Sequence, residues 1–218
     1  MPNLSLNDVS YKYDDAQAVA VSEASCRFEP AMLYAVVGPS GSGKTTLLAL
    51  LAGLDSPSSG EIYFDGENIS KMNLDFYRRK DIAMIFQSFQ LFPLMTALEN
   101  VCYPLELCRV NTRDAIPRAK MLLESLGISP EQMKRFPSRL SGGEQQRVAI
   151  ARSLASGARI LLADEPTGNL DVANTKNIMD ILQKLAHDEG YCVIIVTHDL
   201  EIAESADVIY QMRGGVLS

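Results

Sequence analysis

The 218-residue sequence predicts a single α/β domain built on a parallel sheet. Two observations indicate this class. Apolar runs of strand length alternate with segments of helical periodicity, and the middle of the chain shows helical periodicity only. We therefore expect a core lobe formed by residues 1–87 and 154–218, with an antiparallel β part near its amino terminus. A helical lobe at residues 88–153 is expected to be inserted between the two halves of the core.

The amino-terminal part is predicted to consist mainly of strands. Leu4, Leu6 and Val9 partly alternate with polar residues, and residues 32–37 form a continuous apolar run of the kind found in buried strands. The leucines of residues 45–54 form a broad apolar helix face. The expected elements are short strands within 3–37, a helix at 45–54, a strand at 61–66 that ends in a turn, and a strand at 82–86.

The remaining elements alternate between helix and strand after a helical stretch at 97–128. Within that stretch, residues 113–126 have helical spacing, and Pro117 is expected in the first turn, where proline is tolerated. The expected elements that follow are helices at 141–155, 175–185 and 200–206, strands at 159–163 and 192–196, and a hairpin of 208–212 with 216–217 around Gly214 and Gly215.

Composition and charge exclude several classes of protein. A net charge of −7 argues against general nucleic-acid binding. No apolar run approaches the roughly 20 residues of a membrane helix, and the amino terminus lacks the basic and apolar regions of a signal peptide. The four scattered cysteines have no metal or redox spacing and suit a reducing compartment. We expect a cytoplasmic protein unless a partner holds it at a membrane.

A glycine-rich loop lies between the apolar run at 32–37 and the helix at 45–54. It has the form G-x-x-x-x-G-K-[ST], in the strand–loop–helix context of a phosphate-binding loop. Its glycines allow backbone N–H groups to face phosphate oxygens, and the helix N-terminus adds positive charge. Lys44 is expected to bridge the β- and γ-phosphates, and Thr45 to ligate Mg²⁺. The expected nucleotide-binding residues of the loop are Gly38, Pro39, Ser40, Gly41, Ser42, Gly43, Lys44, Thr45 and Thr46.

Two carboxylates follow the apolar run at 159–163. Ligands collect at the carboxyl edge of a parallel sheet. Asp164 is expected to hold Mg²⁺, directly or through water. Glu165 is expected to act as general base on the attacking water, a role worth roughly 10²–10⁴ in rate. Taken alone, the pair also fits a solvated acidic turn before the next helix.

The motif Leu-Ser-Gly-Gly-Glu-Gln-Gln-Arg occupies residues 140–147. By itself it indicates a helix that starts at a glycine pair. Together with the phosphate-binding loop and Asp164–Glu165, it resembles the ATP-binding subunit of ABC (ATP-binding cassette) transporters over nearly the whole chain. The resemblance implies a P-loop NTPase core of the RecA-like type and ATPase activity, with ATP and Mg²⁺ as cofactors.

The resemblance assigns roles to further residues. In such a subunit, Ser141, Gly142 and Gly143 contact the nucleotide of the other subunit in a head-to-tail dimer. Gln87 contacts Mg²⁺ and the attacking water, and His198 contacts the γ-phosphate. The expected catalytic residues are therefore Glu165, His198, Gln87 and Lys44, and the expected metal ligands are Thr45, Gln87 and Asp164.

The adenine contact is assigned to an aromatic residue near the amino terminus. Tyr13 is preferred by its position in the motif, and Tyr11 is the competitor. The segment Asn169–Asp171 matches a loop that communicates across the dimer. Most members begin this loop with Ser-Ala, whereas here residues 168–171 read Gly-Asn-Leu-Asp. No role is assigned to His187.

One branch of the family matches most closely. Pro166–Asp171 and Gln87–Phe89 resemble the lipoprotein-releasing, macrolide-export and cell-division ATPases, whereas Ala83–Met84 stands where an Ile-Gly pair is common. The resemblance implies integral membrane permease subunits as partners, docking near Gln87–Tyr103. The apolar run at 89–95 fits either such a docking surface or the core of the helical lobe.

The sequence therefore predicts a motor subunit whose homodimer closes on ATP and moves membrane subunits, in an exporter or extrusion system. It would sit peripherally on the inner face of the cell membrane. The alternative is a membrane-recruited regulator of the cell-division type that transports nothing. A soluble ABC protein of DNA repair or translation is disfavoured, because the sequence has neither a second cassette nor a long coiled coil.

Overall fold

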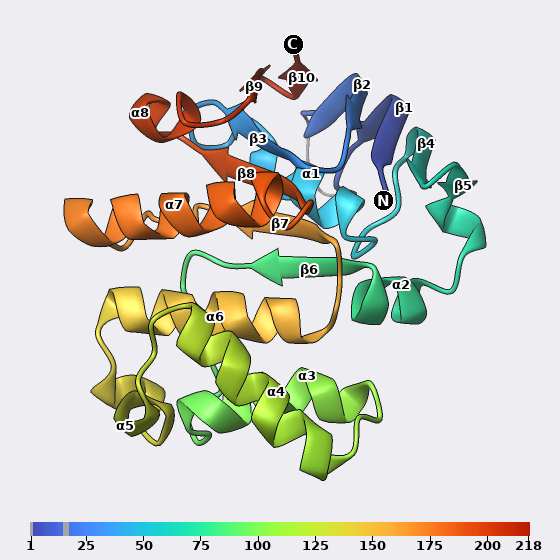
Figure 1. The fold of residues 1–218 in the computed structure, drawn as a ribbon. Helices are drawn as coiled ribbons and strands as arrows, with labels where there is room; N and C mark the ends of the chain where they lie inside the picture. The colour runs from blue at the N-terminus through green and yellow to red at the C-terminus, as the bar shows by residue number, and fades with distance from the viewer. Residues whose placement is uncertain (1, 15–17) are drawn as a thin grey trace.

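The computed structural model describes residues 2–14 and 18–218 (Figure 1). Met1, the first residue of the amino-terminal segment discussed above, lies outside the described residues, as do residues 15–17. The described strands are β1 (Leu4–Tyr11), β2 (Val21–Phe28), β3 (Met32–Val37), β4 (Ser59–Phe64), β5 (Glu67–Asn68), β6 (Ile82–Ile85), β7 (Ile160–Asp164), β8 (Cys192–Thr197), β9 (Val208–Arg213) and β10 (Val216–Leu217).

The strands are hydrogen-bonded in the order β5-β4-β1-β2-β10-β9-β3-β8-β7-β6. The half from β9 to β6 is parallel, whereas β1, β2, β4 and β5 pair antiparallel. The short strand β10 joins the halves, since it pairs with β2 on one side and with β9 on the other. The predicted α/β class, with a parallel sheet and an antiparallel amino-terminal part, is confirmed.

The helices lie in distinct layers around the sheet. They are α1 (Lys44–Leu51), α2 (Leu74–Lys80), α3 (Ala97–Leu107), α4 (Thr112–Ser125), α5 (Pro130–Met133), α6 (Gly142–Ala155), α7 (Val172–His187) and α8 (Leu200–Ala203). Short 3₁₀ turns occupy 69–71 and 137–139. In Figure 1, α3 to α6 gather beyond β6, at the bottom of the view, and α7 runs along the sheet above them.

Each face of the parallel sheet has its own apolar core. One core packs the leucines of α1 between the antiparallel strands and residues such as Tyr34, Val36 and Val196. The other packs the opposite face, including Ala35 and Ile195, against α7 and continues into α3, α4 and α6. The alternation of neighbouring residues between the two cores is what the period of two along a strand dictates.

The structure corrects several predicted elements. Pro117 is the sixth residue of α4 and not in its first turn, because the helix already begins at Thr112 with Asn111 as its cap. Helix α7 starts earlier than residue 175, since the Asp171 side chain accepts the N–H of Asn174. Helix α2 was not predicted. It is capped by Asn73, whose side chain accepts the N–H of Phe76.

The cysteines are all free thiols, as their spacing predicts. Burial raises the pKa of both Cys26 and Cys192 to about 12, so these two are neutral at physiological pH. No helix within residues 2–14 and 18–218 combines the length and the apolar character that a membrane crossing needs.

Candidate functional site

The carboxyl ends of the parallel strands meet at one edge of the sheet. In the register, Val37 of β3 lies opposite Thr197 of β8, and Val196 lies opposite Asp164 of β7. The phosphate-binding loop, Glu165 and His198 follow these positions directly, and Gln87 comes two residues after β6. The topology therefore brings the predicted residues of four separate segments to the ligand-binding edge.

The phosphate-binding loop depends on glycine at two close approaches. A side chain at Gly38 would overlap the Met212 carbonyl oxygen, and one at Gly43 would overlap that of Ala20. Gly43 also has a φ of 105° and stands before α1, where no side chain caps the helix. The uncapped N–H groups at the start of α1 remain available to an anion.

The Lys44 side chain is largely buried and folds back on its own loop. Its ammonium donates to the carbonyl oxygens of Gly38 at 2.7 Å and of Pro39 at 3.0 Å. These two bonds hold the cation at the mouth of the loop, where a phosphate oxygen would be a better partner for its charge.

An oxygen pair beside the loop fits a hard cation. The Thr45 hydroxyl donates to the Asp164 carboxylate at 3.2 Å. Burial raises the pKa of the Asp164 carboxyl, and the bond from Thr45 opposes that shift. No cluster of three or more His, Cys, Asp or Glu side chains suited to a metal is found among the described residues. A cation here would therefore share its coordination with phosphate and water, which is the usual habit of Mg²⁺.

Glu165 is held in an unusual backbone conformation. Its φ is 47°, and its N–H donates to the carbonyl of Val196 at 3.0 Å. The carboxylate meets His198 Nδ1 at 2.9 Å and accepts from the Thr197 hydroxyl at 3.4 Å. Left-handed non-glycine residues are costly and cluster at functional sites. The carboxylate is thus fixed by two partners from the end of β8.

Lys44, Asp164 and Glu165 line an open pocket of about 440 Å³. His198 lines a different pocket, which shares Glu165 with this one. Tyr13 lies in its wall, and its hydroxyl is hydrogen-bonded to Thr46 Oγ1 at 3.0 Å. Tyr11 packs edge-on against Tyr13, with 4.9 Å between ring centroids, and does not line the pocket. The pocket is lined by Tyr13, Ala20, Ser40, Gly41, Gly43, Lys44, Thr45, Thr46, Gln87, Asp164 and Glu165.

The Ser141–Gly143 motif lies outside this pocket. It opens α6, where the Ser141 hydroxyl accepts the N–H of Glu144 and the Glu144 carboxylate accepts the N–H of Ser141. Gly143 is buried against α7, and a side chain there would overlap that of Asn174. Within one chain, therefore, the motif and the phosphate-binding loop do not share a pocket.

The comparisons with known proteins identify the family. The model of the ABC transporter family matches residues 21–168. The chain belongs to the ABC transporter family. It is an ATP-binding subunit of this family and an ATPase, as its sequence predicts.

Two of the similar proteins have names that belong to the predicted branch. The ABC ATPase is 42% identical over 217 residues to the lipoprotein-releasing system ATP-binding protein LolD 2 of Rhodopirellula baltica, covering 95% of the chain and 85% of the relative. It is 39% identical to the macrolide export ATP-binding/permease protein MacB of Syntrophobacter fumaroxidans, covering 100% of the chain but 31% of that longer protein.

A solved structure has the same fold over nearly the whole length. The ATP-binding cassette MJ0796, in a dimeric post-hydrolysis state bound to ADP and Pi, superposes with a TM-score of 0.89. It is 35% identical and covers 99% of this chain and 96% of its own. This likeness confirms the predicted cassette fold.

Two hydrogen bonds that support the site of this ABC ATPase were not predicted. The fully buried Gln146 of α6 donates to the Pro166 carbonyl at 2.7 Å, next to Glu165. Asn169 donates to the Gln87 carbonyl at 3.0 Å. The only sequence feature that points to Gln146 is its place in the polar run after Ser-Gly-Gly. Nothing in the local sequence indicated the Asn169 contact.

Proposed function

We propose that this ABC ATPase is the motor subunit of an export or extrusion system. Two copies close head to tail on ATP, so that each nucleotide lies between the phosphate-binding loop of one copy and Ser141–Gly143 of the other. The observation that carries the proposal is the position of that motif. It opens a helix, as an anion-binding segment does, yet it lies outside the pocket around Lys44. A second copy would complete the site.

Within the pocket, each residue has a chemical task. The Tyr13 ring would stack on adenine, and the loop from Gly38 to Thr46 would enclose the phosphates. Lys44 would exchange its two carbonyl bonds for phosphate oxygens. Thr45, Asp164 and Gln87 would hold Mg²⁺, which neutralises phosphate charge when bound.

Hydrolysis would depend on the carboxylate of Glu165. It would take the proton of the attacking water as the water oxygen bonds to the γ-phosphorus and the bond from that phosphorus to the bridging oxygen breaks, which releases ADP. His198, 2.9 Å from this carboxylate, would orient it and contact the γ-phosphate. ATP favours the closed dimer because only that state completes its contacts, and hydrolysis reopens the dimer.

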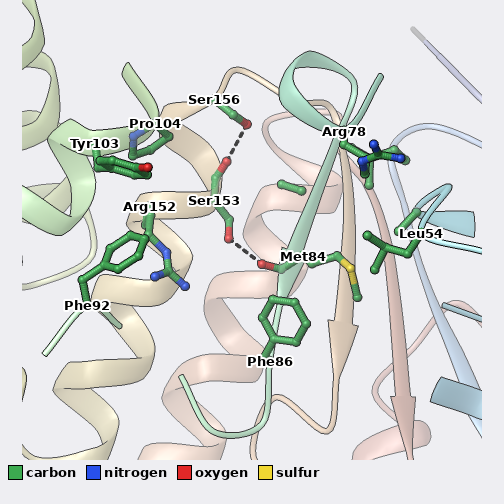
Figure 2. Close-up of a pocket in the computed structure, with 13 residues that line it drawn as sticks. Leu54, Arg78, Met84, Phe86, Phe92, Tyr103, Pro104, Arg152, Ser153 and Ser156 are labelled. Carbon is green, nitrogen blue, oxygen red and sulfur yellow. Dashed lines mark hydrogen bonds between the residues drawn. The ribbon is translucent and has the colours of Figure 1, made fainter. Parts of the chain in front are cut away.

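We infer that a groove lined by Phe86, the residue before Gln87, is the docking site for the membrane partner (Figure 2). Its volume is about 340 Å³, and it is walled by apolar groups that include Leu54, Met84 and Phe92. Arg78 and Arg152 also line it, whereas none of its described lining residues carries a carboxylate. Arg78 is already paired with Asp75 at 2.6 Å, whereas the Arg152 guanidinium donates only to neutral carbonyl groups of Phe89 and Gln90. We infer that the occupant is a cytoplasmic segment of a permease with apolar side chains and a carboxylate, which complements the Arg152 guanidinium.

The run at 89–95 divides between the two roles that its sequence allows. Phe92 and Leu94 are exposed, Leu94 to 89%, and Phe92 lines the groove, whereas Leu91 packs against the apolar core that includes the helices α3, α4 and α6. An exposed apolar group of this kind fits a partner surface. We also propose that residues 1–87 and 154–218 form a core lobe and that residues 88–153 form a helical lobe. Permease docking would hold the protein at the inner face of the membrane.

The test is capture from native membranes with ATP, using Glu165→Gln to trap the closed dimer. We expect a co-purifying permease with few membrane helices and a large extracytoplasmic domain. Phe92→Asp in the same background should lose that permease, since it places a carboxylate against Arg152 and in the groove. Lys44→Ala should capture less because it binds less ATP.

Other outcomes distinguish an exporter subunit from an importer subunit or a regulator. Capture of a many-helix permease with a binding protein would refute the export branch. A partner whose signalling changes with ATP turnover, while no substrate crosses the membrane, would favour the regulator alternative. Capture that Phe92→Asp leaves unchanged would refute the groove as the docking site.

A further inference from the structure

The loop that follows β6 is strained next to Gln87. Phe89 and Gln90 have φ values of 59° and 48°, so two consecutive non-glycine residues adopt the left-handed conformation. Each such residue is less stable in this conformation than in an ordinary one. The loop therefore needs contacts that hold it in place, and it begins at a residue of the nucleotide pocket.

Arg152 of α6 supplies those contacts. Its guanidinium donates to the carbonyl of Gln90 at 2.6 Å and to that of Phe89 at 3.1 Å. Both acceptors belong to the left-handed pair, so the fork binds the strained conformation specifically. The guanidinium also lies 5.8 Å from the centre of the Phe92 ring, on the same loop.

The neighbouring residue fixes the helix to the strand. The Ser153 hydroxyl donates to the carbonyl of Met84 in β6 at 3.0 Å, as Figure 2 shows. Helix α6 is therefore anchored both to β6 and to the loop that β6 feeds. Between these anchors stands Gln87, whose own carbonyl accepts from Asn169 at 3.0 Å.

We propose that Arg152 is a positioning residue for ATP hydrolysis, which holds the Phe89–Gln90 turn so that Gln87 stays in the nucleotide pocket. The proposal rests on the proposed function, which gives Gln87 its place at Mg²⁺ and the attacking water. Arg152 also lines the docking groove. A permease carboxylate seated in the groove would reach the same guanidinium and thereby act on Gln87.

The test compares steady-state ATP hydrolysis by the full chain and its variants. Arg152→Ala should lower kcat about tenfold, the effect of losing a charge-assisted hydrogen-bonded fork, and leave KM for ATP within about twofold. Arg152→Lys keeps the charge and most of the stem but not the planar fork, so its kcat should be intermediate. The kcat of Arg152→Lys still tests the proposal if Arg152→Ala folds poorly.

Arg159→Ala is the matched control. Arg159 also donates to a carbonyl, that of Glu189 at 3.1 Å, and also lies over a ring, that of Tyr191 at 4.8 Å. It lines neither the groove nor the nucleotide pocket. Its removal should leave kcat unchanged. An equal loss of kcat in both arginine variants would mean a general structural effect and would overturn the proposal.

A double-mutant cycle with Gln87→Ala separates the role of Arg152 from the role of Gln87. If Arg152 acts through Gln87, the double variant should have the kcat of Gln87→Ala alone, within about twofold. Multiplied losses, or a normal kcat in Arg152→Ala, would refute the role of Arg152 while leaving the proposed function intact. A normal kcat in Gln87→Ala would refute the catalytic place of Gln87 in the proposed function itself.

Discussion

The buried side chain of Asn100 should be a major support of the loop between β6 and α3. It is fully buried, and its Oδ1 accepts the N–H of Phe92 at 2.8 Å. Its amide nitrogen lies within 3.2 Å of the carbonyl oxygens of Phe92, Met95 and Thr96. Two N–H groups can serve two of these carbonyls at a time, so the residue makes the equivalent of three buried hydrogen bonds.

At about 1 kcal/mol for each bond, Asn100→Ala should lower the free energy of unfolding by about 3 kcal/mol. Urea denaturation followed by circular dichroism measures this loss. The exposed helix cap Asn111, which accepts one N–H from Arg113, is the control. Its alanine variant should lose only about 1 kcal/mol. Equal losses in the two variants would refute the reasoning.

A second substitution adds a test by pH. Asn100→Asp keeps the acceptor for Phe92 but turns a carboxyl group toward carbonyl oxygens in a buried site, which raises its pKa in the folded state. When folding raises the pKa of a carboxyl, the free energy of unfolding falls as the pH rises above the unfolded pKa of about 3.9. The variant should therefore become less stable relative to Asn100→Ala between about pH 4 and neutrality. A difference in stability between the two variants that does not change with pH would show that this carboxyl is exposed to water.

Three further variants test Glu165 and the start of α6. Glu165→Gln should lower kcat roughly 10²–10⁴-fold and leave ATP binding nearly unchanged in equilibrium dialysis; a wild-type rate would disprove its role as base. Gly143→Ala should displace Asn174, with which an added methyl group overlaps, and lower ATPase activity measurably; unchanged activity would mean that the α6–α7 contact yields freely. The Ser141 N–H holds the pKa of the Glu144 carboxyl below its ordinary 4.5. The wild type should therefore have a higher free energy of unfolding in urea than Glu144→Gln, by less than about 1 kcal/mol, at every pH above 4.5. This difference should disappear as the pH falls through the lowered pKa of the native state. A difference that persists in acid would contradict the reasoning.

The sequence predicts the nucleotide pocket well because its parts have local signatures. The glycine loop and the Asp164–Glu165 pair each follow an apolar run of strand length, and the carboxyl ends of parallel strands share an edge. Their convergence follows from these two facts. Tyr13 was harder, since only the resemblance separated it from Tyr11, and the structure places it against Thr46.

The supporting contacts have no such signature. Gln146 and Arg152 bind backbone carbonyls of distant segments, and Asn100 binds those of the loop just before its own helix. Neither the period of a helix nor a turn motif marks such a bond. Helix α2 was missed because only seven residues form it, too few for a clear period. Pro117 was misplaced because even the predicted start at residue 113 makes it the fifth residue of the helix, beyond a first turn of about 3.6 residues; the start at Thr112 makes it the sixth.

The position of β3 in the sheet sets the order in which the nucleotide site can form during synthesis. This strand feeds the phosphate-binding loop, yet both of its neighbours come from the last part of the chain, β8 at 192–197 and β9 at 208–213. The glycine loop thus leaves the ribosome long before the strands that flank it and before the Met212 carbonyl against which Gly38 packs. Contacts between distant segments form slowly. A nascent chain should therefore be unable to capture ATP tightly until its carboxyl-terminal strands have emerged and inserted beside β3.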